Sequence, residues 1–228
     1  MNIPWNRSSL SLVCSVLALQ LTAFFDPAKA VDEKWKSDMI TDAIQAAPPS
    51  VTDTATIYAW TPAGKMMLVR QGEGPYKCVA SGAFTLRLGK PSLPYPDPMC
   101  MDQNGWAFFK ALWSETNPLK PSKPYPTAPG LVWMLAGMSV KKGAVAMGKA
   151  DKSVIQTHAG KGAGDVFQMS PHVMIMPMPF DKKVAKFSKK YNIDRPLDSW
   201  IMAAGTPIEH LMVHFSKEDA KALMEPNK

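Results

Sequence analysis

Two short stretches near the C-terminal end of the chain alternate between polarisable and purely hydrocarbon side chains. They cover residues 172–176 and 210–214, with the sequences HVMIM and HLMVH. The polarisable residues are His172, Met174 and Met176 in the first stretch and His210, Met212 and His214 in the second. Because successive side chains of a β-strand point to opposite faces, each stretch predicts a strand with one histidine and methionine face. We expect these two strands to be inner neighbours of one sheet.

Earlier apolar stretches predict further strands. Residues 55–60 and 65–70 are joined by a four-residue loop that contains proline and glycine, which is typical of a hairpin. Residues 76–80 follow another glycine-rich turn, so we expect the three strands to form an antiparallel meander. Residues 130–136 are apolar throughout, which indicates a strand covered on both faces. A further strand is expected at residues 200–204.

Helical spacing and capping residues predict helices between these strands. The expected helices cover residues 35–47, the segment from Asp102 or Asn104 to Glu115, residues 181–191, and residues 217–224 with Ser216 as N-cap and Asp219 at the capping-box position. Long proline-rich loops are expected at 88–100 and 117–129, and an irregular excursion at 137–165 with a short strand at 144–147. The irregular order of strands and helices predicts an α+β fold, with one mainly antiparallel sheet and a few helices packed on it.

The beginning of the chain predicts export. Arg7 precedes a mostly apolar segment at residues 10–25, and Ala28-Lys29-Ala30 fits the cleavage rule, so residues 1–30 are expected to be a secretory signal peptide. An uncleaved membrane anchor is the alternative. Residues 31–228 are expected to form a single globular domain, periplasmic or secreted, with no membrane span after signal cleavage. Residues 31–50 are expected to be either a helix docked on the sheet or a mobile N-terminal arm.

The cysteines and the charge indicate which compartment and which classes of partner fit the chain. Cys78 and Cys100 remain after cleavage, and an even pair in an oxidising compartment predicts one disulfide; a thiol metal pair or a reactive cysteine is the alternative. The formal net charge is +7 and the basic residues are mainly lysines. Lysine is less suited than arginine to planar recognition of bases or phosphate, and an exported chain does not meet nucleic acid. The lysines indicate a solvated basic surface, and the alternative is weak contact with anionic envelope components.

Three motifs resemble a family of small exported bacterial proteins that has no assigned activity. They are Pro96-Asp-Pro-Met-Cys100, Ser170-Pro-His172-Val-Met174 and Gly205-Thr-Pro207-x-x-His210-x-Met212. The similarity runs from about Ala55 to Phe215, and it implies export but no catalytic or binding residue. The family pattern has proline at the position of His214, which sets this histidine apart from the other candidates.

The histidine and methionine strands raise the hypothesis of a soft-metal site. Imidazole and thioether together suit Cu(I), so copper is the candidate cofactor. If the strands pair antiparallel, His172 and His210 could share an ion, with Met174, Met176 and Met212 beside them. The competing interpretation is an ordinary core, because methionine fills irregular cores and a buried histidine is often hydrogen-bonded to backbone carbonyls.

The sequence gives little support to catalysis. Ser170 and His172 share a face of one strand, and Glu209 is adjacent to His210, but neither pair predicts a nucleophile with a base held by a third group. A hydrolase with an unrecognised site is therefore a further alternative. The leading hypothesis is a non-catalytic binding or envelope protein, because the tryptophans and long proline-rich loops suit a binding surface, although they suit an ordinary core equally well.

Overall fold

The computed structural model describes residues 32–141, 166–181, 186–189, 195 and 197–225. The expected signal peptide at residues 1–30 and the expected short strand at 144–147 lie outside this part of the chain. No helix among the described residues is long and apolar enough to cross a membrane.

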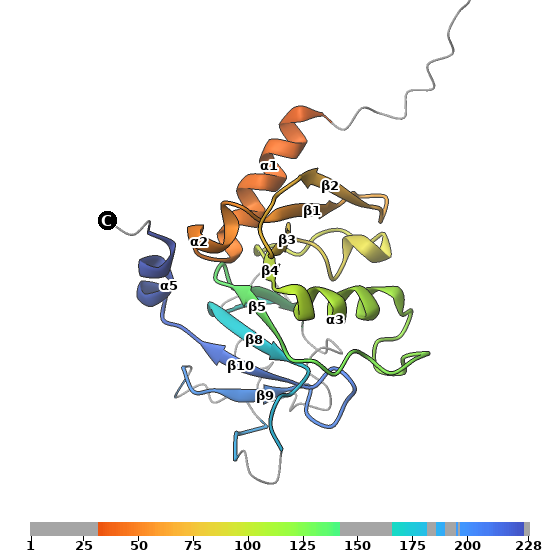
Figure 1. Cartoon of the computed structure of the whole chain (residues 1–228), viewed down its shortest axis with the longest axis vertical. Helices are drawn as coiled ribbons and strands as arrows, with labels where there is room; N and C mark the ends of the chain where they lie inside the picture. The colour runs from red at the N-terminus through yellow and green to blue at the C-terminus, as the bar shows by residue number, and fades with distance from the viewer. Residues whose placement is uncertain (1–31, 142–165, 182–185, 190–194, 196, 226–228) are drawn as a thin grey trace, which may run out of the picture. The chain divides into compact units, whose positions relative to one another are not determined.

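The core of the fold is an eight-stranded sheet (Figure 1). Its strands follow one another across the sheet in the order β2-β1-β3-β4-β5-β8-β10-β9. Their bounds are β1 Thr56–Trp60, β2 Met66–Arg70, β3 Lys77–Val79, β4 Met99–Met101, β5 Gly130–Met134, β8 His172–Met176, β9 Trp200–Met202 and β10 His210–His214. A separate two-stranded sheet pairs β6 Met138–Lys141 with β7 Val166–Met169. Helices pack on this mainly antiparallel sheet, so the predicted α+β class is confirmed.

The first three strands correct the expected meander. β1 and β2 form the predicted antiparallel hairpin, but β3 pairs with β1 in parallel. The connection after β2 crosses the beginning of β1: the amide of Gly74 donates to the carbonyl of Thr54, and the amide of Thr56 donates to the carbonyl of Tyr76. Gly72 permits this crossing, because a Cβ there would lie 2.3 Å from the carbonyl oxygen of Thr54. The chain therefore enters β3 on the far side of β1.

Helix α3, Gln103–Ser114, covers one face of the sheet. Asp102 caps it as predicted, since its carboxylate accepts the amide of Gly105 at 2.7 Å and also that of Leu131 at 2.9 Å. The bond to Gly105 begins the helix, and the bond to Leu131 holds the N-terminal end of the helix against β5. The buried side chains of α3 that face the sheet are Phe108, Phe109, Leu112 and Trp113. They form one hydrophobic cluster with methionines of β4, β5, β8, β9 and β10.

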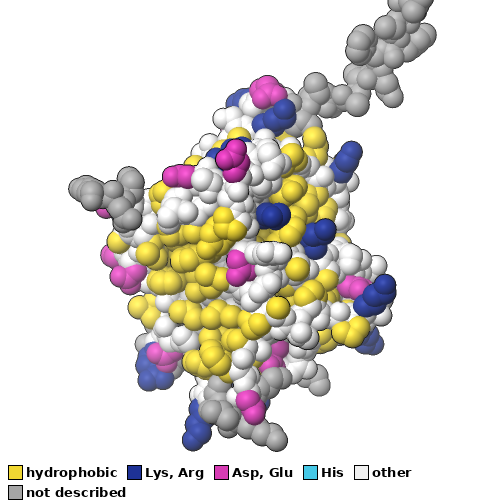
Figure 2. Space-filling model, in the orientation of Figure 1, with side chains coloured by type: hydrophobic (Ala, Val, Ile, Leu, Met, Phe, Trp, Pro, Cys, Tyr) yellow, Lys and Arg dark blue, Asp and Glu magenta, His cyan; other side chains and the backbone are white. Residues whose placement is uncertain are grey.

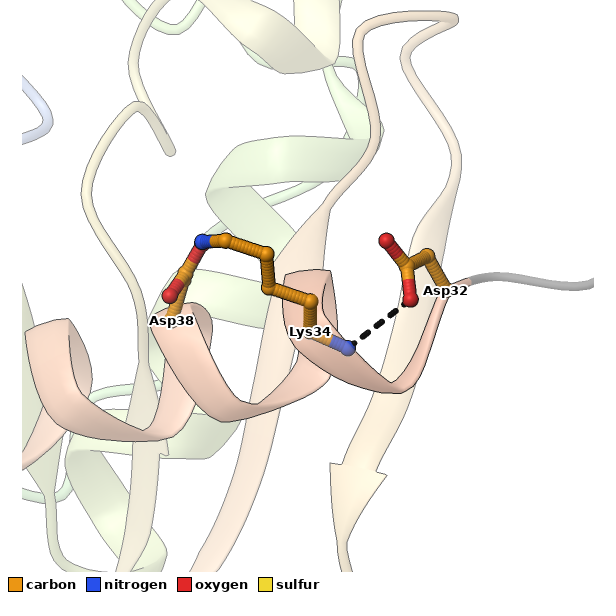
Figure 3. A network of polar contacts seen from close by, with 3 residues as sticks. All are labelled: Asp32, Lys34 and Asp38. Atoms are coloured by element: carbon orange, nitrogen blue, oxygen red, sulfur yellow. Dashed lines mark hydrogen bonds and ion pairs between the residues drawn. The ribbon is translucent and has the colours of Figure 1, made fainter.

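On the opposite face of the sheet, three short elements cover β1, β3 and β4. They are α1 Glu33–Ala43, the 3₁₀ helix η1 Ile44–Ala46 and α2 Pro49–Thr52. Asp32 caps α1 by accepting the amide of Lys34 at 3.0 Å, and the ammonium of Lys34 pairs with Asp38 at 2.6 Å (Figure 3). Ala43, Ala46 and Val51 belong to a second buried cluster with residues of β1, β3 and β4. Trp35, Met39, Ile40 and Ile44 also pack, partly buried, against this cluster.

The predicted disulfide is confirmed. Cys78 of β3 and Cys100 of β4 are directly opposed in the antiparallel register, and their Cα atoms are 4.0 Å apart. The bond closes a loop that contains η2, Leu86–Leu88, and the proline-rich segment before β4. Within this loop the buried carboxylate of Asp97 accepts the amide of Gly82 at 2.7 Å.

Three expectations for the second half of the chain have different outcomes. The described part of the predicted helix at 181–191 is not helical at residues 186–189, where Ser188 forms a bridge with Trp200 instead. The final helix α5, Lys217–Met224, begins as predicted, because the hydroxyl of Ser216 accepts the amide of Asp219 at 3.0 Å. The strand expected to be covered on both faces, β5, alternates instead between buried and half-buried residues.

Candidate functional site

The histidine and methionine strands are neighbours in the sheet, as the sequence predicts. β8 pairs with β10 in antiparallel register, and β5 and β9 flank this pair. Opposed residues form three rows on the face that α3 covers. The first row is Met134, His172 and His214, the second is Val132, Met174, Met212 and Trp200, and the third is Gly130, Met176, His210 and Met202. In the third row, Met176 lies beside His210 when the β8–β10 register is continued by one pair.

The register corrects the expected approach of His172 to His210. His172 is opposed by His214, with ring centroids 5.5 Å apart, whereas His210 lies two rows away. Four residues of strand correspond to about 13 Å along the sheet, which is too far for two directly opposed ligands of one ion. The first row therefore brings together the histidine pair that the sequence analysis did not favour.

His172 and His210 are held in the same way. Each begins its strand, and each donates its Nδ1 proton to the backbone carbonyl two residues earlier: Ser170 for His172 and Ile208 for His210, both at 2.7 Å. A carbonyl only accepts hydrogen bonds, so each neutral ring carries its proton on Nδ1 and presents a bare lone pair at Nε2. Both Nε2 atoms are buried and make no hydrogen bond within the described structure.

Local structure explains why these two rings are positioned so similarly. Proline precedes His172, and because it has no amide N–H the ladder of β8 starts at the histidine. Before His210 the chain makes a tight turn, in which the carboxylate of Glu209 accepts the amide of Gly205 and the hydroxyl of Thr206 donates to the carbonyl of Ala203. Glu209 therefore supports the turn.

His214 uses both of its ring nitrogens. The indole N–H of Trp200 lies 2.8 Å from Nε2, and the hydroxyl of Ser170 lies 2.9 Å from Nδ1. Indole nitrogen only donates, so Nε2 must be the acceptor, and the proton of the neutral ring lies on Nδ1 and is donated to Ser170. The planes of the Trp200 and His214 rings are nearly parallel, with 6° between them. This arrangement leaves His214 without a lone pair for a metal ion.

Burial keeps the other two rings neutral. Burial, reinforced by the nearby His214, lowers the pKa of His172 to about 3. Burial lowers the pKa of His210 to about 4, although its bond to the Ile208 carbonyl acts in the opposite direction. None of the described histidines is visible on the surface in Figure 2, which fits their burial beneath α3 and the loops.

The structure adds residues that the sequence analysis did not include. Met134 and Met202 complete the rows on either side of the histidine strands, and Trp200 fixes the tautomer of His214. Met202 had a detectable signal, because Trp200 and Met202 alternate with Ile201 in the same period as the other strands. Among the described residues, no group of three or more His, Cys, Asp or Glu could hold a metal ion, so any metal here would depend on thioethers.

Comparison of the chain with protein-family models, with curated proteins and with solved structures finds no match. The resemblance to small exported proteins therefore remains a prediction, and the site has to be interpreted from its own geometry.

Proposed function

We propose that this protein is an exported, non-catalytic binding protein. The observation that supports this most directly is the hydrogen bond from the indole of Trp200 to Nε2 of His214. This bond determines the tautomer of His214, whose other ring nitrogen lies 2.9 Å from the hydroxyl of Ser170. A serine nucleophile needs a base with a free lone pair directed at its hydroxyl.

Here the imidazole is in the wrong tautomer for that role. Its Nδ1 donates a proton to Ser170 and so has no lone pair to receive one. Reversing the tautomer would place the Nε2 proton against the indole proton of Trp200. Ser170 does line a surface cleft of about 560 Å³, together with Lys217 and Lys221, so a ligand could approach it. The cleft supports binding, whereas the tautomer argues against activation of the serine.

A second feature supports a binding role. On the face of β5, β8 and β10 opposite α3, Leu131, Ile175 and Val213 are half-buried, whereas Val173 and Leu211 are buried. Figure 2 shows hydrophobic side chains gathered in the region where Figure 1 places these three strands. Apolar surface of this kind is typical of a protein that contacts a partner.

Export is supported by the disulfide and by the predicted leader. A buried disulfide between opposed strands persists in an oxidising compartment and is rare in the reducing cytosol. Periplasmic or secreted location is thus the setting in which we propose that binding occurs.

Two measurements test the proposal. The protein is treated with a serine-reactive fluorophosphonate and with activated esters, and Ser170→Ala serves as the matched control. We expect no labelling and no turnover that depends on Ser170. In parallel, a thermal-shift screen of metal ions and anionic envelope polymers is expected to find a ligand that raises Tm reversibly. Ser170-dependent turnover would overturn the non-catalytic assignment.

A further inference from the structure

We infer that the third row of the histidine and methionine face is a Cu(I) site, with His210, Met176 and Met202 as ligands. This inference rests on the proposed binding function and names the ligand. Its first support is position. Met202 is directly opposed to His210 in the β9–β10 register, and continuing the β8–β10 register places Met176 on the other side. Opposed side chains of neighbouring strands have Cβ atoms about 4.5–5.5 Å apart.

The second support is the unpaired nitrogen of His210. The side chain is only 6% exposed, and its Nε2 makes no hydrogen bond within the described structure. A buried polar atom without a partner is costly, so natural proteins rarely retain one without a reason. The bond from Nδ1 to the Ile208 carbonyl fixes the ring in the tautomer that metal-binding histidines adopt, with the metal on the other nitrogen.

The third support is the chemistry of the surroundings. Met176 and Met202 are almost fully buried, and Met174 and Met212 occupy the adjacent row of the same hydrophobic cluster. Thioethers are soft, uncharged ligands, and together with one imidazole they favour Cu(I) over Zn²⁺ or other hard ions. Cu(I) also accepts a low coordination number, which a strand row with one nitrogen and two sulfur atoms can supply.

Chain neighbours of the proposed ligands line a surface cleft. Pro177 follows Met176, Pro207 begins the segment that leads to His210, and both prolines line a surface cleft of about 440 Å³. Phe108 and Tyr125 complete the side of this cleft nearest to α3. The third row thus lies at the end of its strands, close in sequence to two residues that line a cleft, which is where an entry path for an ion is expected.

His172 provides the matched internal control. It is equally buried, has the same bond from Nδ1 to a carbonyl, and has the same unpaired Nε2. Its opposed neighbours differ, because they are Met134 on one side and His214 on the other, and the nitrogens of His214 are both engaged. If burial of a histidine alone explained copper binding, the two positions would behave alike.

The test is a Cu(I) titration of the protein expressed with its own leader and purified without metal. Cu(I) is maintained with ascorbate in the absence of oxygen, and affinity is measured by competition with a chromophoric Cu(I) chelator. We expect wild type to bind one equivalent. His210→Gln should abolish binding, and Met176→Leu and Met202→Leu should each weaken it by about tenfold or more. His172→Gln and Met99→Leu should retain the wild-type affinity.

A second measurement keeps the inference testable if a variant does not fold. Wild-type protein labelled with ¹⁵N-histidine is titrated with Ag(I), which is an air-stable substitute for Cu(I). Only the Nε2 resonance of His210 should shift. No binding by wild type, equal loss in His172→Gln, or a shift at His172 would overturn the copper site. A different ligand from the thermal-shift screen would leave the proposed binding function intact, whereas Ser170-dependent turnover would remove that function whatever the copper result.

Discussion

Acidification from pH 7 to pH 5 should destabilise the metal-free protein through its two buried histidines. In the folded state the pKa values of His172 and His210 are lowered to about 3 and about 4, whereas an unfolded histidine titrates near 6.5. The unfolded chain therefore binds protons that the folded chain does not, and stability falls as pH drops below about 6.5. Between pH 7 and pH 5 each histidine contributes a loss of about 2 kcal/mol.

Asp97 opposes this loss. Burial raises its pKa to about 6, although the bond from the Gly82 amide acts in the other direction. The folded state binds the Asp97 proton more tightly than the unfolded chain, in which the pKa of aspartate is near 3.9. Stability therefore rises as pH falls below about 6, by about 1 kcal/mol between pH 7 and pH 5. The two histidine losses less the Asp97 gain leave a net loss of about 2.5 kcal/mol between pH 7 and pH 5. At pH 5 the slope of stability against pH corresponds to uptake of about one proton on unfolding.

The assay is urea unfolding at half-unit pH intervals from 7 to 5, with a chelator present and the disulfide intact. The slope of unfolding free energy against pH is compared between variants, because each substitution also changes absolute stability. His172→Gln and His210→Gln should each flatten the slope by about one proton, and Asp97→Asn should steepen it by about one. Wild-type stability that is constant or rises toward pH 5, or slopes that do not differ between variants, would show that these three buried groups do not set the pH dependence.

Three further predictions concern the scaffold. Replacing both Cys78 and Cys100 by serine should lower stability by about 3 kcal/mol, measured by urea unfolding, because the disulfide closes a loop of 22 residues; an unchanged midpoint would contradict this. Gly130→Ala should cost about 1–3 kcal/mol, since its Cβ would lie 2.0 Å from the amide nitrogen of Gly105 in α3; wild-type Tm would show that this contact yields easily. Ser216→Ala should cost about 1 kcal/mol and increase amide exchange in the first turn of α5; unaltered exchange there would argue against the cap.

Local signals in the sequence predicted the elements whose structure is decided locally. The hairpin of β1 and β2 has its own proline and glycine loop, α3 has the cap residue Asp102, and α5 has Ser216. The direction of β3 could not be predicted in this way. The direction of β3 depends on the segment after β2, which forms backbone hydrogen bonds with Thr54 and Thr56. The sequence of β3 itself does not indicate these bonds.

The candidate site shows the same limit. Period-two alternation fixes which face a side chain occupies, because a slip by one residue would expose the whole methionine face. A slip by two or four residues keeps every face the same, so the pattern could not choose between His210 and His214 as the neighbour of His172. That choice follows from the turn before His210 and from the β8–β10 register, which the sequence does not specify locally.

The copper site and the pH dependence both require that His172 and His210 are neutral imidazoles with a proton on Nδ1 and an unpaired Nε2. Two-bond ¹H–¹⁵N correlation spectra of the histidine rings, recorded on metal-free protein at pH 7 and pH 5, measure this directly. We predict that both rings show the Nδ1–H tautomer at both pH values. A ring with its proton on Nε2, or a charged imidazolium at pH 5, would contradict the neutral Nδ1–H assignment of that histidine.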